Sequence, residues 1–204
     1  MEHIRNYISV LQETLGQLPV QLIDDVIGIL QQARMQGNQV FIMGNGGSAS
    51  TASHFVCDLA KNTRHADMPH FRVIGLTDNM ALFAAYANDE GYENVFSQQL
   101  LNLIKPGDVV IGISASGNSK NVINAMEEAK KHNATTIGFT GFDGGLLGKM
   151  VKINIHVKSN IIEHVEDIHL VLEHIIIKTM KERMQSFTKS TTALSKLQAD
   201  VLSA

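Results

Sequence analysis

Five short runs of apolar, mostly β-branched residues recur along the chain, and each run ends in small polar residues. The runs cover residues 40–43, 71–76, 109–113, 135–139 and 153–157. Because they are continuously apolar rather than alternating, they predict strands of a parallel sheet that is covered on both faces. Stretches of helical periodicity separate them, at residues 50–62, 80–87, 94–104, 119–132 and 161–184. This alternation, with short connections, predicts a doubly wound α/β fold with a five-stranded parallel sheet, of the flavodoxin-like type.

The first 36 residues or so carry apolar side chains at helical spacing, with Pro19 in the middle. Because proline interrupts the hydrogen bonding of a helix, we expect two helices or one kinked helix there. This N-terminal helical segment and the sheet together predict one domain over residues 1–184.

The end of the chain differs in composition from the rest. Residues 185–204 are rich in Ser and Thr, and they are expected to form a C-terminal tail. Such a tail could lie free on the surface or present an apolar stripe to a partner helix. The stripe would consist of Leu194, Leu197 and Val201.

Charge and cysteine content exclude several classes of function. Seventeen Lys and Arg against twenty Asp and Glu give a formal net charge of −3, without the basic excess of a nucleic-acid-binding surface. A single cysteine excludes a disulfide framework and a multi-cysteine zinc site, and it is typical of a reducing compartment. The chain shows no signal peptide and no apolar run of about 18 residues, so we expect a cytoplasmic protein without a membrane span.

The first polar loop reads Gly44–Asn45–Gly46–Gly47–Ser48–Ala49–Ser50 and leads directly into a helical stretch. Glycines let a backbone approach a ligand closely, and serine hydroxyls can donate to the ligand or cap the helix. The loop is not a P-loop, because no Lys–Ser or Lys–Thr pair follows, and it does not match the dinucleotide-binding G-x-G-x-x-G pattern. It predicts either an anion-binding loop or a plain helix-capping loop.

The second polar loop, after the third expected strand, reads Ser114–Ala115–Ser116–Gly117–Asn118–Ser119. Its three hydroxyls and several backbone N–H groups converge on one helix N-terminus, which suits a phosphate monoester. Helix capping alone would need fewer serines. This loop therefore predicts a phosphate site more strongly than the first one does.

Histidines and carboxylates follow at two places. His54 and Asp58 are four residues apart on the helix that the first loop opens, so they share one face of it. A second group, from Glu163 to His169 and on to His174, lies in the last helical stretch. A His–carboxylate pair at this spacing can bind a metal, perform acid–base chemistry or lie solvated on a helix surface. Its position beside a phosphate loop favours the first two roles.

These motifs resemble those of the SIS (sugar isomerase) domain. Residues 113–119, followed by Asn121–Val122, are similar to the phosphate loop of that domain. Together with the first loop and Thr140–Gly145, they are most similar to the phosphoheptose (sedoheptulose 7-phosphate) isomerase family, and the likeness extends to about Met184. The resemblance implies an aldose–ketose isomerase that acts on a phosphorylated sugar, binds a divalent metal such as zinc, and forms homotetramers with active sites at subunit interfaces.

The resemblance also implies roles for individual residues. Asp58 and His174 match the acid–base pair of the family, and the family's zinc ligands match His54, Asp58, Glu166 and His174. Family contacts to the substrate match Asn45, Gly46, Gly47, Ser48, Asn88, Asp89, Ser114, Ala115, Ser116, Ser119 and Glu166.

Two of these positions depart from the family pattern. Asp58 stands where the family has Glu, and Glu166 stands where it has Gln. A metal would then meet two carboxylates and two imidazoles, which suits zinc and is also reasonable for manganese, iron or nickel. Glu166 and His174 are eight residues apart, about 12 Å along a straight helix. One ion could reach both only if the first turn is frayed or if one residue comes from another chain.

Two alternatives share the same motifs. One is a non-enzymatic SIS module that binds a sugar phosphate or a protein partner, like the replication-initiator-associating relatives of this family. The other is an isomerase of a different sugar phosphate. Of the remaining histidines, His169 is expected either beside the site or in the core, and His164 is expected on the surface at a helix start.

Overall fold

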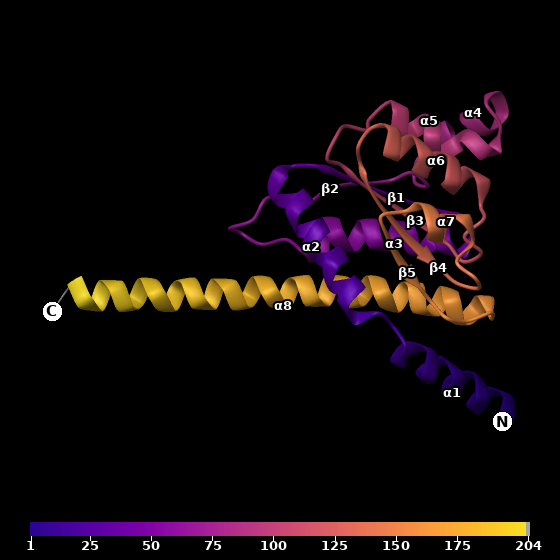
Figure 1. Cartoon of the computed structure of the whole chain (residues 1–204). Helices are drawn as coiled ribbons and strands as arrows, with labels where there is room; N and C mark the ends of the chain where they lie inside the picture. Colours follow the sequence, from indigo (N-terminus) through magenta and orange to yellow (C-terminus); the bar gives the residue numbers. More distant parts are fainter. Residues whose placement is uncertain (203–204) are drawn as a thin grey trace.

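Five parallel strands form one sheet in the computed structural model, as the apolar runs predict (Figure 1). The strands are β1 (Gln39–Gly44), β2 (Arg72–Gly75), β3 (Val109–Ser114), β4 (Thr135–Thr140) and β5 (Ile153–His156). Their order in the sheet is β2-β1-β3-β4-β5. The order reverses between β1 and β3, whose central residues Ile42 and Ile111 are paired. In a doubly wound sheet, ligands bind at the carboxyl ends of the strands that flank such a reversal.

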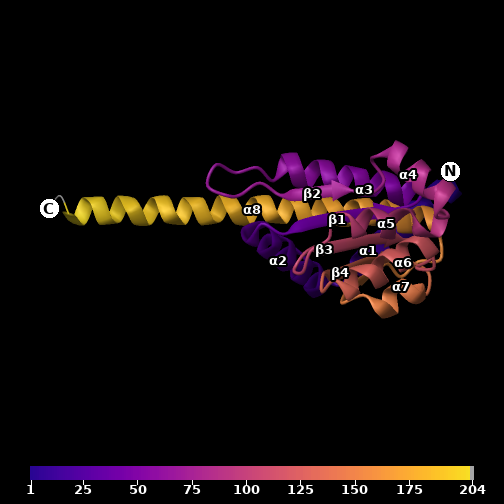
Figure 2. The ribbon, with the colours of Figure 1, turned by 90° about the horizontal axis from the view of Figure 1, so that it is seen from above.

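Helices cover both faces of the sheet. They are α1 (Glu2–Gly16), α2 (Val20–Gln36), α3 (Gly47–Cys57) with a π-helical turn (Asp58–Asn62), α4 (Met80–Asp89), a 3₁₀ turn (Tyr92–Asn94), α5 (Val95–Leu101), α6 (Lys120–Lys131), α7 (Gly145–Met150) and α8 (Ile162–Leu202). Helices α2, α3 and α8 lie on one face, and α4 to α7 lie on the other (Figures 1 and 2). Each expected helix is present, and α7 is a further short helix.

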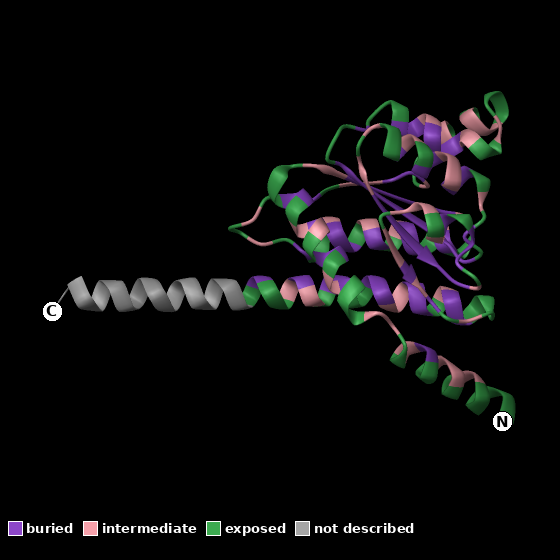
Figure 3. Cartoon of the chain, viewed as in Figure 1, coloured by how far each residue is buried: buried purple, intermediate pink, exposed green. Residues whose placement is uncertain are grey.

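Alternate residues of each central strand enter two separate hydrophobic cores. In β1, Val40 and Ile42 pack with α2, α3 and α8, whereas Phe41 and Met43 pack with α5 and α6. All four side chains are fully buried. Figure 3 shows the buried residues gathered on the strands and on the helix faces that cover them. The double burial explains why the strands read as continuous apolar runs.

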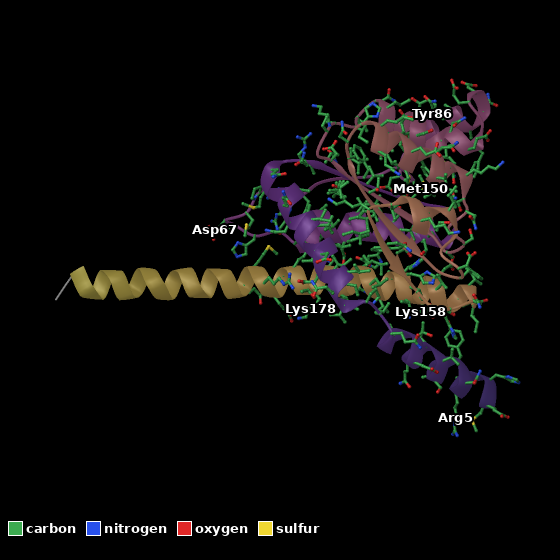
Figure 4. The ribbon with its side chains drawn as sticks, in the orientation of Figure 1. Arg5, Asp67, Tyr86, Met150, Lys158 and Lys178 are labelled. Atoms are coloured by element: carbon green, nitrogen blue, oxygen red, sulfur yellow. The ribbon has the colours of Figure 1, made fainter. Side chains whose placement is uncertain are left out.

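The N-terminal segment forms two helices, as the proline predicts. Helix α1 ends at Gly16, and Pro19 is the N-cap residue of α2, where a missing backbone N–H costs little. Helix α1 buries only Thr14 and leaves Ile4 and Ile8 exposed. Figure 4 places Arg5 of α1 and Lys178 of α8 on the side of the molecule away from α4 to α7.

The structure describes residues 1–202, with side chains through Gln185. Helix α8 continues past Met184 to Leu202 and projects well beyond the sheet (Figure 1). The expected stripe of Leu194, Leu197 and Val201 lies outside the described side chains, and Ser203 and Ala204 lie outside the described residues. None of the helices in the described part is long and apolar enough to cross a membrane.

Candidate active site

A cavity of about 400 Å³ opens at the carboxyl ends of β1 and β3, at the reversal of strand order. Both polar loops contribute to its wall, and the first turns of α8 close one side. Its lining consists of Asn45, Ser48, Ile113, Ser114, Ala115, Ser116, Ser119, Phe142, Ile162 and Glu166. Seven of these were expected to contact a substrate from sequence.

The glycines of the first loop bring its backbone close to α3. A Cβ atom on Gly44 would lie 2.6 Å from the carbonyl oxygen of Ser48, and Gly46 has a φ of 55°. Other residues rarely adopt that conformation or tolerate that contact. The side chain of Asn45 bonds to Asn121 of α6 and to Tyr92. The loop is therefore held in one conformation, with the N-terminus of α3 facing the cavity.

The serine loop presents its hydroxyls to the same cavity. The N–H of Gly117 donates to the carbonyl oxygen of Ser114 over 3.0 Å, and the Oγ atoms of Ser114 and Ser119 lie 3.0 Å apart. Ser119 is the N-cap residue of α6, yet its side chain makes no capping hydrogen bond. Plain helix capping therefore does not account for these serines. Hydroxyls and a helix N-terminus together offer the hydrogen-bond donors that suit an anion such as a phosphate.

The loop after β4 supports the serine loop from behind. The N–H of Leu147 donates to the carbonyl oxygen of Gly117 over 2.9 Å, and the N–H of Gly141 donates to that of Ala115 over 2.8 Å. The Oδ1 atom of Asn118 accepts from the N–H of Leu146. These bonds fix the serine loop against α7, so its N–H groups and hydroxyls keep their direction without a ligand.

A second group of polar side chains lies farther along α3 and α8. One ligand atom from each of His54, Asp58, Glu173 and His174 lies within 4.8 Å of the others. The Nε2 atoms of His54 and His174 are 3.4 Å apart, and Nε2 of His54 is 3.9 Å from Oδ1 of Asp58. Asp58 begins the π-helical turn and accepts a hydrogen bond from Asn62. The structure thus brings together His54, Asp58 and His174, as expected from sequence.

Glu173 was not expected in this group, and its surroundings are unusual. Its side chain is fully buried, and neither oxygen has a hydrogen-bond partner among the described residues. Nε2 of His174 lies 3.6 Å from Oε2 of Glu173, and the carboxylate of Asp58 is also close. Burial and, to a smaller extent, the neighbouring carboxylate of Asp58 together raise the pKa of Glu173 to about 8. The signal in the sequence was an acidic residue in the apolar stripe of α8, between the buried Leu172 and Ile176.

This group has the chemistry and spacing of a divalent metal site. Two Zn–N bonds of 2.0–2.1 Å at a tetrahedral angle place two nitrogens about 3.3 to 3.4 Å apart, close to the distance between the two Nε2 atoms. The side chains of His54 and His174 are 44% and 51% exposed, whereas Asp58 and Glu173 lie buried beneath them. Two carboxylates also match the charge of a divalent cation. The residues present therefore fit a metal.

The structure does not bring Glu166 into this group. Its carboxylate lies against Gly47, at the first residue of α3, where the helix dipole favours a negative charge. The two helices touch at two places. At the first place Gly47 of α3 meets Glu166 of α8, and at the second His54 of α3 meets Glu173 and His174 of α8, seven residues farther along each helix. The two helices therefore run side by side in the same direction (Figures 1 and 2), and the cavity lies about 10 Å from the metal-binding group.

Four residues expected to contact the substrate are not among those that line the cavity: Gly46 and Gly47, which begin α3 next to it, and Asn88 and Asp89. Asn88 and Asp89 end α4, are exposed, and bond to each other through Nδ2 and Oδ1 over 2.7 Å. Neither is among the residues that line the cavity. In a single chain, both side chains therefore face solvent and do not reach this cavity.

The other histidines of α8 belong to the interior. His169 is fully buried against Phe139, with ring centroids 6.0 Å apart. Of its two expected places, beside the site or in the core, it therefore occupies the core. The expectation of a surface position for His164 is wrong, because it is buried beneath α1 with its ring against Tyr7. The sequence did not reveal that α1 crosses this part of α8.

Comparisons with known proteins agree with this geometry. The family model of the SIS domain matches residues 3–141. The phosphoheptose isomerase of Aquifex aeolicus is 37% identical over 166 residues, which cover 81% of this chain and 86% of that protein. The phosphoheptose isomerase of Geotalea daltonii is 36% identical over 187 residues, which cover 90% and 97%. Among solved structures, the phosphoheptose isomerase of Neisseria gonorrhoeae superposes with a TM-score of 0.82 at 27% identity, over 89% of this chain and 98% of that one.

Proposed function

We propose a function for this chain from the premise that it belongs to the SIS domain family and, within it, to the phosphoheptose isomerases. It is an aldose–ketose isomerase that interconverts sedoheptulose 7-phosphate and glycero-manno-heptose 7-phosphate. The observation that carries this proposal is the convergence of His54, Asp58 and His174, from helices distant in sequence, about 10 Å from a cavity whose loops suit a phosphate.

The acid–base work falls to Asp58 and His174. Asp58 takes the proton from C1 of the ketose, which leaves an enediol(ate), and returns it to C2 of the aldose. His174 delivers a proton to O2 and receives the one that leaves O1. Each carbon and each oxygen thus exchanges one proton, and the reaction needs no oxidant or reductant. Asn62 donates to Oδ1 of Asp58, which orients this carboxylate.

The serine loop holds the phosphate of the substrate. Ser114, Ser116 and Ser119 offer hydroxyl donors, and the N-terminus of α6 adds backbone N–H groups. Binding energy from this end of the sugar orients the carbon atoms that react at the other end. Asn45, Ser48 and Glu166 line the wall that a sugar chain would follow.

We infer that the metal-binding group holds a divalent ion, with zinc as the leading candidate. His54, Asp58 and His174 offer the nitrogen and oxygen ligands that zinc prefers. When bound, the ion would supply stabilisation of negative charge on the sugar oxygens. The proton transfers remain with the side chains of this chain.

We further infer that the active enzyme is a homo-oligomer, with a tetramer as the expected form and active sites at its interfaces. His54 and His174 are about half exposed, although an enediol(ate) needs protection from water. Helix α8 projects beyond its own domain, and α1 leaves Ile4 and Ile8 exposed. A second copy that covers these surfaces would enclose the reacting end of the sugar. Because phosphorylated sugars are charged and retained inside cells, we place the enzyme in the cytoplasm.

The proposal is tested by turnover of the purified protein on sedoheptulose 7-phosphate. We expect isomerisation by the wild type, and loss of isomerisation with retained binding of the phosphosugar in His174→Ala. Full turnover by that variant would contradict the assignment. Assays on a panel of hexose and pentose phosphates show whether the substrate is a sugar phosphate other than the heptose. If the protein binds no metal and converts no sugar phosphate, it is a non-enzymatic module.

A further inference from the structure

We propose that Glu173 is a ligand of the metal site and that it supplies there the second carboxylate, a role that the family resemblance implies for Glu166. The proposal rests on the inferred metal dependence of the isomerase, and it concerns which residues of this chain hold the ion. It follows from the position of the Glu173 side chain, which is fully buried and lies within the same compact group as His54, Asp58 and His174.

The first observation is that the carboxylate of Glu173 is buried without compensation. The residue is 0% exposed, and both of its oxygens lack a hydrogen-bond partner in the described part of the chain. An unpaired buried carboxylate costs several kcal/mol of folding free energy, and this cost is avoided only by a proton or a cation. Apolar residues surround it on α8, since Leu172, Ile176 and Ile177 all belong to the hydrophobic core. A leucine at this position would match its neighbours.

The second observation is where this carboxylate points. It belongs to the compact group formed with His54, Asp58 and His174, and it lies on the buried side of that group. The two imidazoles lie on the opposite, exposed side. A cation among the four side chains would meet carboxylate ligands on its buried side and imidazole ligands on its exposed side.

The third observation excludes Glu166 from the same ion within one chain. Helix α8 begins at Ile162, so Glu166 lies within the regular helix rather than in a frayed turn. Its carboxylate packs against Gly47, and Gly47 lies seven residues before His54 on α3. Glu173 lies on the same face of α8 as Glu166, seven residues and about two turns later. The metal site is therefore complete in a single chain, and Glu166 is left to the sugar cavity.

A further consequence concerns stability. In the metal-free protein, the polar carboxyl group of Glu173 is fully buried among apolar residues, which costs folding free energy. Leucine at this position removes that cost, whereas in the metal-bound protein the carboxylate is needed as a ligand. Substitution of Glu173 is therefore expected to raise the stability of the metal-free protein and to lower the affinity for the metal, two effects of opposite sign.

The experiment measures metal binding without substrate. Wild type, Glu173→Gln, Glu173→Leu and the control Glu166→Gln are stripped with chelator and titrated with Zn²⁺ and Mn²⁺ by calorimetry, with thermal unfolding recorded for each form. We expect one ion per wild-type chain, an affinity lowered about a hundredfold or more in both Glu173 variants, and an affinity near wild type in Glu166→Gln. We also expect the metal-free Glu173→Leu protein to unfold at a higher temperature than the metal-free wild type.

Each other outcome overturns the proposal. Equal metal affinity of wild type and both Glu173 variants would show that Glu173 is no ligand, and a greater loss in Glu166→Gln would return that role to Glu166. Absence of metal binding by the wild type would remove the site itself. None of these results depends on turnover. Failure of the isomerase assignment is seen separately, as absence of sugar conversion by a wild type that still binds metal.

Discussion

The side chains of Asn45 and Asn121 exchange two hydrogen bonds, in which each Nδ2 donates to the other Oδ1, over 2.9 and 2.8 Å. One residue belongs to the glycine loop and the other to the buried face of α6, which begins after the serine loop. The pair therefore connects the two loops that form the cavity. The hydroxyl of Tyr92 also donates to Oδ1 of Asn45, so both lone pairs of this oxygen are used and its amide direction is fixed.

From this pair we predict that Asn121→Ala lowers kcat/KM for sedoheptulose 7-phosphate at least about tenfold, because a loosened Asn45 no longer presents its amide to the sugar. Steady-state kinetics on the purified variant measures this. Glu127→Ala, an exposed position on the same helix, serves as the control and should retain wild-type kinetics. Equal kinetics of wild type and Asn121→Ala would show that the pair does not position the substrate.

A second prediction concerns the contact behind the serine loop. Gly145 has a φ of 55°, and a Cβ atom on it would lie 2.5 Å from the carbonyl oxygen of Ser116. Gly145→Ala therefore displaces the serine loop and strains the backbone by about 1–3 kcal/mol. We expect KM for the sugar phosphate, and the inhibition constant of inorganic phosphate, to rise about tenfold or more. Gly28→Ala, a helical position with open space around it, should leave both constants unchanged.

A third prediction concerns stability at acidic pH. The pKa of His169 is lowered to about 4, chiefly by burial; a backbone contact with Thr140 opposes this in part, and the charge of His156 adds to it. The unfolded chain binds this proton near pH 6.5, whereas the folded protein does not until about pH 4. The contribution of His169 to the free energy of unfolding is therefore fully present above pH 6.5. It falls by up to about 3 kcal/mol as the pH drops from 6.5 to 4.

Urea unfolding of wild type and His169→Phe at several pH values between 4 and 7.5 tests this contribution. Because phenylalanine does not titrate and suits a pocket beside Phe139, the variant should lose less stability than the wild type between pH 6.5 and 4. The comparison of slopes cancels any constant change in packing. Parallel pH profiles of the two proteins would mean that His169 does not contribute to the acid sensitivity.

How far the sequence predicts this molecule depends on the range of the interactions involved. The strands and most helices follow from local periodicity, and the two loops follow from glycine and serine at strand ends. Helix α7 was missed because its six residues include two glycines and it is stabilised by contacts with the serine loop. Among site residues, His54, Asp58 and His174 were identified through motifs. Glu173 was not, because its role depends on how α3 and α8 are rotated against each other.

The last prediction tests whether one active site contains residues of two chains. Ser116→Glu adds a negative charge to the phosphate cavity, and His174→Ala removes the acid–base imidazole, so each variant alone should be inactive. If the cavity of one copy faces the metal-binding group of another, subunits that are mixed and allowed to exchange form some sites with both wild-type residues. Random pairing in a symmetric oligomer then restores up to about a quarter of wild-type activity.

The mixed sample is compared with each variant alone and with a mixture in which exchange is blocked by cross-linking before mixing. Recovery only after exchange supports an interface site, because the two intact residues then come from different chains. If exchange is verified by mass and no activity returns, Ser116 and His174 of one site belong to the same chain. The sugar would then have to span the two helical turns, about 10 Å, that separate the serine loop from the metal-binding group on α3 and α8.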